Sequence, residues 1–410
     1  MITALSLLLA CNPATDTGPV ADDTGIPDEI TETATGAVDA LIAGDRELAS
    51  TLQELAWAEG WPLLTDRGTM FFIAEGGGDW SVAGDFNGWA PAPMEHGEGF
   101  SWLEVEIAEP AGVGYKFVRD DAWSADPWSR SYTWDDNGRM SYVRAPTALP
   151  HLELWPAMRG AGLGPRSVRV YVPAGEGPWP VLYMHDGQNL FDPGAFWGGW
   201  RMQEALEEAS GEVLVVGIDN TEARMDEYVH AEDQLEALYG GLGDEYAAFV
   251  QEELRPFIEE QYPTEGPTGV MGSSLGGLIS LSIADLYPGA YDFAGSLSGT
   301  LGWGRFGLDN PTVQELYLAA GVRETVLYVD SGGDDGGDGC TDPDGDGFFE
   351  DDPNGADNYC ESRQFVDAMA DQGYTWEQDL FHWWQPQAEH NEAEWAARVD
   401  RPLEIFLSLR

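Results

Sequence analysis

The sequence predicts an α/β fold, in which a large domain with a mostly parallel, doubly wound sheet follows a small all-β domain. From residue 149 onward, apolar runs typical of buried strands alternate with helix-like stretches. One of these runs leads through a glycine-flanked turn at Ser274 into a helix-like stretch. Residues 68–146 instead alternate apolar and polar residues between glycine-containing turns, as antiparallel sheets do. The 410 residues suffice for both domains.

The first 30 residues predict an export signal and a tether. A short apolar run ends in Leu8-Leu9-Ala10-Cys11, which resembles the bacterial lipobox whose cysteine is lipidated. The run is too short to span a bilayer, so a signal peptide is the better interpretation. No lysine or arginine precedes it, which leaves a chance match as the alternative. We therefore expect an exported bacterial lipoprotein that meets the membrane only through Cys11, faces the periplasm or exterior, and has residues 12–30 as a tether.

Residues 31–148 predict one or two amphipathic helices and then a β-sandwich. Segments 82–89 and 114–120 resemble the early-set, glycogen-binding-like sandwich of carbohydrate-binding family 48, an immunoglobulin-like fold. The resemblance raises the possibility of a sugar site with Trp89 and Trp123 as stacking platforms. Aromatic side chains of small sandwiches are also common in the core, so a domain that only packs against the larger one is the alternative.

Ser274 is the expected nucleophile. The run Gly272-Ser273-Ser274-Leu275-Gly276-Gly277 lies between a strand-like segment, 268–271, and a helix-like segment, 278–286. This strand–turn–helix pattern holds a serine hydroxyl above a sheet, and glycines flank the serine because the sharp turn crowds its own backbone. An ordinary turn is the alternative, and a later acid and histidine decide between the two.

The general base is expected among the histidines that follow the serine, because the order in this architecture is serine, acid, histidine. Only His382 and His390 of the six histidines follow Ser274. We favour His390, which occupies a loop after the last strand-like run, over His382, which lies within that run.

The acid and the oxyanion hole complete the expected site. The strand-like run 325–330 leads into Ser331-Gly332-Gly333-Asp334-Asp335, so the candidate acids are Asp330, Asp334 and Asp335. An oxyanion hole needs two backbone N–H groups. One belongs to Leu275, and the other to Gly187 or Gln188 in the loop after the strand-like run 180–184.

Four segments, 185–189, 216–220, 272–277 and 389–395, resemble the esterase-D or enterochelin-esterase-like α/β hydrolases, relatives of feruloyl and acetyl-xylan esterases. The resemblance covers about residues 149–410. It implies that Ser274 attacks an ester carbonyl and that His390 is the base, with no cofactor for catalysis. In that family the acid is the last residue of a Gly-Thr-x-Asp or Gly-Thr-x-Glu turn, which lies a few residues past a strand. Here Gly333 replaces the threonine, and the match points to Asp335.

Segment 336–360 predicts a structural calcium loop within the larger domain. Asp342-Pro343-Asp344-Gly345-Asp346-Gly347 resembles a thrombospondin type 3 or dockerin-like loop, and an acidic disordered insertion is the alternative. The expected ligands are Asp342, Asp344, Asp346, Phe348, Glu350 and Asp351. Cys340 and Cys360 bracket the loop, and a disulfide between them would imply an oxidising compartment.

The excess of acidic residues limits the classes of molecule that we expect this protein to bind. The chain has 73 acidic and 19 basic residues and a formal net charge of -54, which disfavours nucleic acids and anionic membranes. The oligomeric state is unknown. We therefore predict a serine carboxylic-ester hydrolase for an extracytoplasmic small-molecule or carbohydrate ester, with siderophore esters also candidates. The alternatives are a surface-anchored glycan-binding protein with an inactive hydrolase domain, and an acyltransferase of the antigen-85-like kind.

Overall fold

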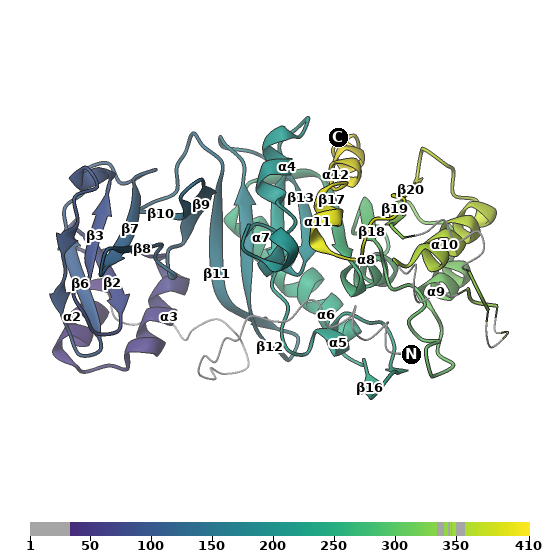
Figure 1. Ribbon diagram of the computed structural model, residues 1–410, viewed down its shortest axis with the longest axis horizontal. Helices are drawn as coiled ribbons and strands as arrows, with labels where there is room; N and C mark the ends of the chain where they lie inside the picture. Colours follow the sequence, from purple (N-terminus) through teal and green to yellow (C-terminus); the bar gives the residue numbers. More distant parts are fainter. Residues whose placement is uncertain (1–32, 334–339, 343–344, 346, 350–356) are drawn as a thin grey trace. The chain divides into compact units, whose positions relative to one another are not determined.

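A computed structural model describes residues 33–333, 340–342, 345, 347–349 and 357–410, which form two compact units (Figure 1). Unit 1 comprises Gly160–Gly164 and Pro178–Arg410, and unit 2 comprises residues 33–159 and Pro165–Gly177. Unit 2 extends past the boundary expected at residue 148, because strands β11 (His151–Gly160) and β12 (Leu163–Val172) continue its sheet. Within the described ranges, no helix is long and apolar enough to cross a membrane.

Unit 1 is built on a parallel sheet, which confirms the predicted α/β class. Its strand order is β14-β13-β17-β18-β19-β20, and each neighbouring pair is parallel. The strands are β13 (Trp179–His185), β14 (Leu214–Ile218), β17 (Thr264–Ser273), β18 (Phe293–Leu297), β19 (Val326–Ser331) and β20 (Leu380–Trp384). Ser273 pairs with Leu297, and Leu297 pairs with Asp330, so the carboxyl ends of β17, β18 and β19 lie level at one edge of the sheet.

Helices surround the strands of unit 1 (Figure 1). Helix α8 (Leu275–Leu286) packs on β17 and β18, and α10 (Tyr359–Gln372) packs on β19 and β20. Helix α12 (Asp400–Leu407) packs Phe406 against Phe293 of β18, with ring centroids 5.7 Å apart. The remaining helices are α4 (Met202–Glu208), α5 (Arg224–Glu227), α6 (Gly243–Ala248), α7 (Arg255–Gln261), α9 (Val313–Ala320) and α11 (Glu392–Ala396).

Shorter elements complete unit 1. They are the 3₁₀ turns η2 (Gly187–Asn189) and η3 (Phe196–Gly198), the π-helical turn η4 (Phe249–Leu254), and the hairpin of β15 (Asp233–Gln234) and β16 (Leu238–Tyr239).

Unit 2 contains two sheets and two helices. One sheet has the order β1-β2-β6-β5, and the other runs β12-β11-β9-β10-β7-β3-β4, with β8 beside β7. The helices are α2 (Ala34–Ala43) and α3 (Leu48–Ala58); the strands not yet given are β1 (Leu63–Leu64), β2 (Met70–Glu75), β3 (Ser81–Gly84), β4 (Ala92–Pro93), β5 (Glu95–His96), β6 (Phe100–Val105), β7 (Gly114–Arg119), β8 (Ala122–Ser124), β9 (Ser131–Asp135) and β10 (Gly138–Tyr142).

Strand β2 joins two cores of unit 2, because successive side chains of a strand point to opposite faces. Phe71 and Ile73 pack with residues of α2 and α3. Met70 and Phe72 pack with Tyr115 and other residues of β3 and β7, so the two sheets share a core. The likeness to the early-set sandwich stays a prediction.

Candidate active site

The expected strand–turn–helix geometry is present at Ser274. β17 ends at Ser273, α8 begins at Leu275, and Ser274 itself has φ 56° and ψ -125°. A positive φ is uncommon for a residue other than glycine and costs of order 1–3 kcal/mol. A Cβ at Gly272 would come within 2.7 Å of the Gly276 backbone, and one at Gly277 within 2.5 Å of Ser296 Oγ. Close packing therefore explains the glycines around this serine.

The two expected sources of oxyanion donors lie side by side. Gly187 and Gln188 begin η2, directly after β13 and Asp186, and Leu275 begins α8. The next residue of that helix, Gly276, packs so closely on the β13 end that a Cβ there would lie 3.3 Å from His185 Cβ and 3.4 Å from Asp186 Oδ2. The first turn of α8 and the loop after β13 are therefore in contact.

A buried ion pair holds the loop after β13. Arg224 donates from Nε and Nη2 to the two oxygens of Asp186, at 2.8 and 2.9 Å, and Asn220 Nδ2 donates to the same carboxylate at 2.6 Å. The backbone N–H of Asn220 donates to Gln188 Oε1 at 3.0 Å. These contacts fix the loop that carries Gly187 and Gln188.

His185, at the end of β13, is held in the interior by aromatic neighbours. Its Nδ1 lies 2.8 Å from the Tyr246 hydroxyl, and Tyr228 packs edge-on against its ring. Burial lowers the pKa of His185 to about 3. The imidazole is therefore neutral near pH 7.

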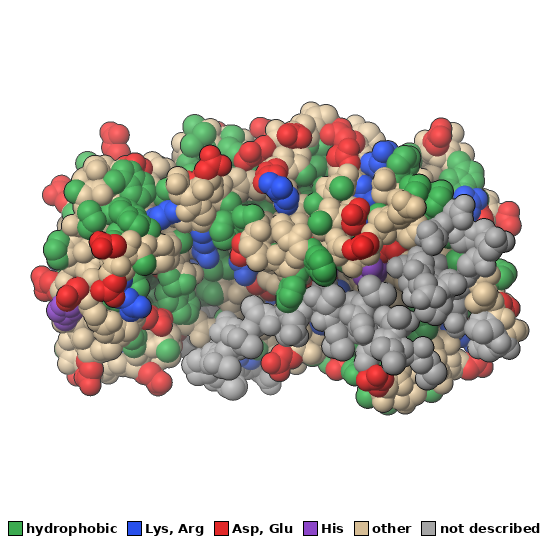
Figure 2. Space-filling view, viewed as in Figure 1, with side chains coloured by type: hydrophobic (Ala, Val, Ile, Leu, Met, Phe, Trp, Pro, Cys, Tyr) green, Lys and Arg blue, Asp and Glu red, His purple; other side chains and the backbone are tan. Residues whose placement is uncertain are grey.

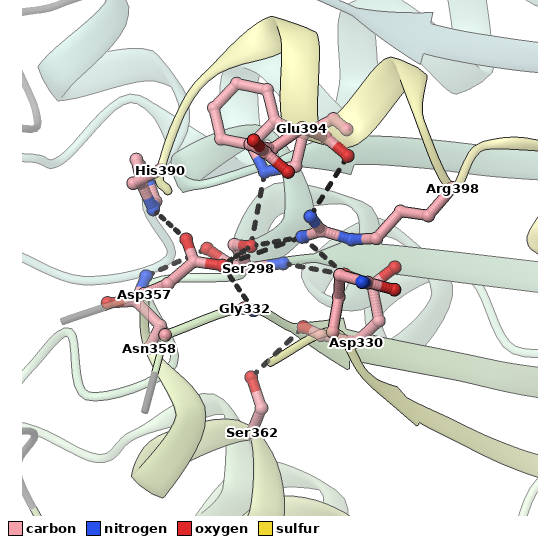
Figure 3. Close-up of polar contacts among 12 residues, drawn as sticks. Ser298, Asp330, Gly332, Asp357, Asn358, Ser362, His390, Glu394 and Arg398 are labelled. Atoms are coloured by element: carbon pink, nitrogen blue, oxygen red, sulfur yellow. Dashed lines mark hydrogen bonds and ion pairs between the residues drawn. The ribbon is translucent and has the colours of Figure 1, made fainter. Parts of the chain in front are cut away.

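His390 forms a buried pair with Asp357 (Figure 3). His390 lies in the loop between β20 and α11, and its Nδ1 is 2.8 Å from Asp357 Oδ1. A carboxylate only accepts hydrogen bonds, so Nδ1 carries the proton and Nε2 is the nitrogen that can take a proton from a hydroxyl. Trp395 packs edge-on against the imidazole, with ring centroids 5.1 Å apart.

Among the described residues, the carboxylate that contacts His390 is that of Asp357, a residue not named among the candidate acids. Asp335 and its alternative Asp334 lie outside the described residues. Asp330 is described, but its carboxylate accepts from Arg398 and from the Tyr328 hydroxyl rather than from His390. The turn after β19, in which the acid was expected, contacts this carboxylate. The backbone N–H of Gly332 donates to Asp357 Oδ2. The turn therefore holds a carboxylate that comes from 25 residues further along the chain.

A disulfide near Asp357 joins two parts of the chain that follow this turn. The predicted disulfide between Cys340 and Cys360 is present, with the two Cα atoms 5.5 Å apart. Asp357 lies three positions before Cys360, next to the helix N-cap Asn358. The only local signal for it in the sequence was an acidic residue just before a cysteine and a helix-like stretch.

Thr300 and Asn358 lie between Ser274 and the His390–Asp357 pair. Ser274 Oγ lies 3.5 Å from Thr300 Oγ1, and Asn358 Nδ2 lies 3.5 Å from the same hydroxyl. The backbone N–H of Ser274 donates to Leu297 O at 3.0 Å, and that of Thr300 donates to Ser274 O at 3.3 Å. The loop after β18 thus lies between the serine turn and the segment that bears the acid.

The other predicted residues lie away from this constellation or outside the description. His382 Nδ1 is 2.9 Å from Val329 O in the neighbouring strand, the place of a structural histidine. Of the expected calcium ligands, Asp342 and Phe348 are described, whereas Asp344, Asp346, Glu350 and Asp351 are not. Across the described residues, no group of three or more His, Cys, Asp or Glu side chains could hold a metal ion. Cys11 also lies outside the described residues.

Comparison with known proteins assigns the family. The family model described as "Putative esterase" matches residues 163–404, more than half of the chain. The chain therefore belongs to this esterase family, which is a class of carboxylic ester hydrolases. Among curated proteins, the uncharacterized protein YbbA of Bacillus subtilis is 32% identical over 154 residues, which are 33% of this chain and 58% of that protein. The match thus spans little more than half of that relative.

Comparison with solved structures finds esterases and a serine hydrolase among the similar chains, at low identity. The enterobactin esterase FES from Shigella flexneri is 14% identical, with a TM-score of 0.45, 83% of this chain covered and 93% of the other. The siderophore hydrolase EstB from Aspergillus nidulans is 18% identical, with a TM-score of 0.48 and coverages of 64% and 97%. The IroE-like serine hydrolase from Shewanella oneidensis is 19% identical, with a TM-score of 0.47 and coverages of 62% and 80%.

Proposed function

We propose that this protein hydrolyses carboxylic esters through Ser274, His390 and Asp357. The observation that carries the proposal is the buried His390–Asp357 pair at the sheet edge where β17 delivers Ser274 in a strained turn. Residues with unusual backbone conformations concentrate at functional sites. Asp357 takes the role that the sequence pointed to in Asp335.

The mechanism follows from the places of these groups. Ser274 Oγ attacks the ester carbonyl carbon while its proton passes to His390 Nε2, and Asp357 stabilises the imidazolium through Nδ1–H. The N–H groups of Leu275 and of Gly187 or Gln188 bind the oxyanion of the tetrahedral intermediate. The intermediate expels the alcohol, which takes the proton from Nε2. Water, deprotonated by His390, then attacks the acyl-enzyme and releases the acid and Ser274.

Hydrolysis of short p-nitrophenyl esters tests this proposal. We expect Ser274→Ala to lower kcat by a factor of about a thousand or more, because the nucleophile is lost. Ser408→Ala, at the exposed end of α12, is the matched control and should keep the wild-type rate. A fluorophosphonate probe should label the wild-type chain at Ser274. Full activity in Ser274→Ala would rule the mechanism out.

The substrate class and location are part of the same proposal. Candidate substrates are carbohydrate and siderophore esters outside the cytoplasm. The Cys340–Cys360 disulfide supports an oxidising compartment, in keeping with a lipid anchor at Cys11. An acyltransferase would use the same residues, and adding alcohol acceptors to the assay and measuring the new ester distinguishes the two reactions.

A groove in unit 2 favours a second function, glycan binding. The groove has a volume of about 590 Å³ and is lined by Trp89, Lys116, Trp123, Asn137 and Met140. The rings of Trp89 and Trp123 lie 6.2 Å apart and are tilted by 40°, and Trp123 is 48% exposed. Lys116 Nζ donates to Asn137 O at 2.8 Å. An exposed and a half-buried indole ring beside polar groups suit the apolar faces and hydroxyls of a sugar.

Affinity electrophoresis in gels that contain glycogen tests the second function. We expect glycogen to retard the wild-type chain and Ser274→Ala equally, and Trp89→Ala and Trp123→Ala to migrate freely. Equal migration of all four variants, with and without glycogen, would reject binding of this glycan. Esterase activity should be unchanged by either tryptophan substitution.

A further inference from the structure

Ser298, Arg398 and Trp395 form a buried hydrogen-bonded cluster, called the hub below. It holds Asp357 Oδ2, the oxygen that does not face His390 (Figure 3). Ser298 Oγ donates to Asp357 Oδ2 at 2.7 Å. The same hydroxyl accepts from Arg398 Nη2 at 2.7 Å and from Trp395 Nε1 at 3.2 Å. A hydroxyl has one donor and two acceptor positions, so Ser298 uses all three. Its single proton must therefore point at the acid.

Arg398 places a buried positive charge between two carboxylates. Its Nη2 lies 3.1 Å from Asp330 Oδ1 and 3.6 Å from Asp357 Oδ2, and all three side chains are at most 1% exposed. Burial raises the pKa of Asp330, and the Tyr328 hydroxyl also donates to that residue. The nearby carboxylates outweigh desolvation and raise the pKa of Arg398. The guanidinium therefore stays charged beside Asp357.

The backbone at Ser298 is shaped for this contact. Ser298 follows β18 directly and has a φ of 47°, in the left-handed region. Its N–H donates to Asp330 O at 2.8 Å, and its carbonyl accepts from Asn358 Nδ2 at 2.8 Å. The residue is thus fixed from β19 on one side and from the acid-bearing segment on the other. In this strained backbone conformation, the Ser298 hydroxyl points at the Asp357 carboxylate.

We propose that Ser298 and Arg398 are positioning residues for ester hydrolysis, which fix the Asp357 carboxylate in the orientation and charge state that His390 requires. This inference rests on the proposed function. Ser298 and Arg398 act through Asp357 and have no contact with the substrate in this scheme. Because both lie on the far side of the acid, their loss disturbs the direction of the His390 Nδ1–H bond without removing either partner.

Kinetics of single and double variants test the proposal on p-nitrophenyl acetate. We expect Ser298→Ala to lower kcat by about 10- to 100-fold with little change in KM, because small misplacements of a catalytic group have effects of this size. Combined with Asp357→Asn, it should cost no further activity, because residues that act through one another are not additive. An independent loss in the double variant, or wild-type kcat in Ser298→Ala, would overturn the inference.

The pH dependence of kcat/KM distinguishes the effect of the Arg398 charge on activity from the effect of its packing. Removing a cation near the imidazole favours the imidazolium form, so Arg398→Gln should move the acid limb of the kcat/KM profile to higher pH. Arg398→Lys keeps the charge and should leave that limb in place while kcat falls. Among the described residues, the charged groups with ion-pair contacts to the pair or to Arg398 are Asp330 from β19, Arg398 after α11, and Asp357 and His390 themselves. An unmoved acid limb in Arg398→Gln would contradict the charge role.

A half-buried arginine–aspartate ion pair away from the site provides the control. Arg323 pairs with Asp285 in the same unit and is 17% exposed. Arg323→Gln should lower the melting temperature without a change in kcat or in the pH profile. If Arg323→Gln and Arg398→Gln behave alike, Arg398 is only structural. If Ser274→Ala retains full activity, the proposed function itself fails, which is a different result from a failure of the hub.

Discussion

At the scale of single residues, the site depends on which of many carboxylates meets His390. Sequence order singled out Ser274 and His390, because a glycine-flanked turn and a short supply of late histidines are local signals. The acid had no such signal, because 73 acidic residues offer many equivalent candidates. The structure joins His390 to Asp357 at 2.8 Å and Asp330 to Arg398 at 3.1 Å.

This assignment makes a residue-scale prediction. Asp357→Asn should lower kcat on p-nitrophenyl esters by about 10⁴, because an amide cannot hold the imidazole in the correct tautomer or stabilise its charged form. Asp335→Asn, at the residue expected from sequence, should keep activity within a few-fold of wild type. Steady-state kinetics of the two purified variants checks this. The opposite ranking would return the role of acid to Asp335.

At the scale of elements, the stretch from the end of β19 to the first turn of α10 carries Asp357 and both cysteines of the disulfide. Asp357 lies within the span closed by Cys340 and Cys360, and Gly332 at the end of β19 donates to its carboxylate. The disulfide therefore limits how far the acid can move from the sheet. A crosslink across 20 residues of sequence also stabilises a folded chain by about 3 kcal/mol.

Removal of this crosslink gives an element-scale prediction. The variant Cys340→Ser/Cys360→Ser should show a lower melting temperature and a lower kcat, because the acid-bearing segment gains freedom. Mild reduction of the wild-type chain should reproduce both effects, and reoxidation should reverse them. Reducing agent should not affect the double variant. Unchanged kcat in the double variant would show that the segment is held by its other contacts alone.

At the scale of the whole molecule, the acidic surface and buried acids such as Asp126 contribute to the response to pH. Acidic side chains are spread over the visible face, in keeping with a net charge of -54 (Figure 2). In unit 2, burial raises the pKa of Asp126 from 3.8 to about 7. Tyr115 donates to its carboxyl at 2.7 Å and the backbone N–H of Trp128 at 2.9 Å.

This buried acid makes unit 2 lose stability as the pH rises. The folded state keeps the Asp126 proton between pH 3.8 and about 7, whereas the unfolded state has already released it. The contribution is therefore fully present below 3.8 and is lost as the pH rises through 7, by up to about 4 kcal/mol.

Thermal unfolding between pH 4 and 8 checks this whole-molecule prediction. The wild-type melting temperature should fall over this range more than that of Asp126→Asn, which cannot titrate at this position. Parallel curves for the two proteins would contradict it.

The sequence predicted local features of the architecture better than the pairing of distant strands. The parallel sheet of unit 1, the strand–turn–helix at Ser274 and the Cys340–Cys360 disulfide follow from local patterns and are present. Strands β11 and β12, which follow the boundary expected at residue 148, continue the sheet path of unit 2 beyond β9. Pairing of distant strands depends on contacts that no local pattern records.

The sequence by itself determined the nucleophile turn and the histidine loop, because steric crowding at Gly272 and Gly277 and the order of residues are local properties. Only the tertiary structure decided the pairing of His390 with Asp357, the contacts of Ser298 with Arg398, and the burial of His185. The physical reason is that a carboxylate, hydroxyl or imidazole has the same chemistry wherever it stands in the chain. Burial, charge and hydrogen-bond partners supplied by distant segments give each of them its role.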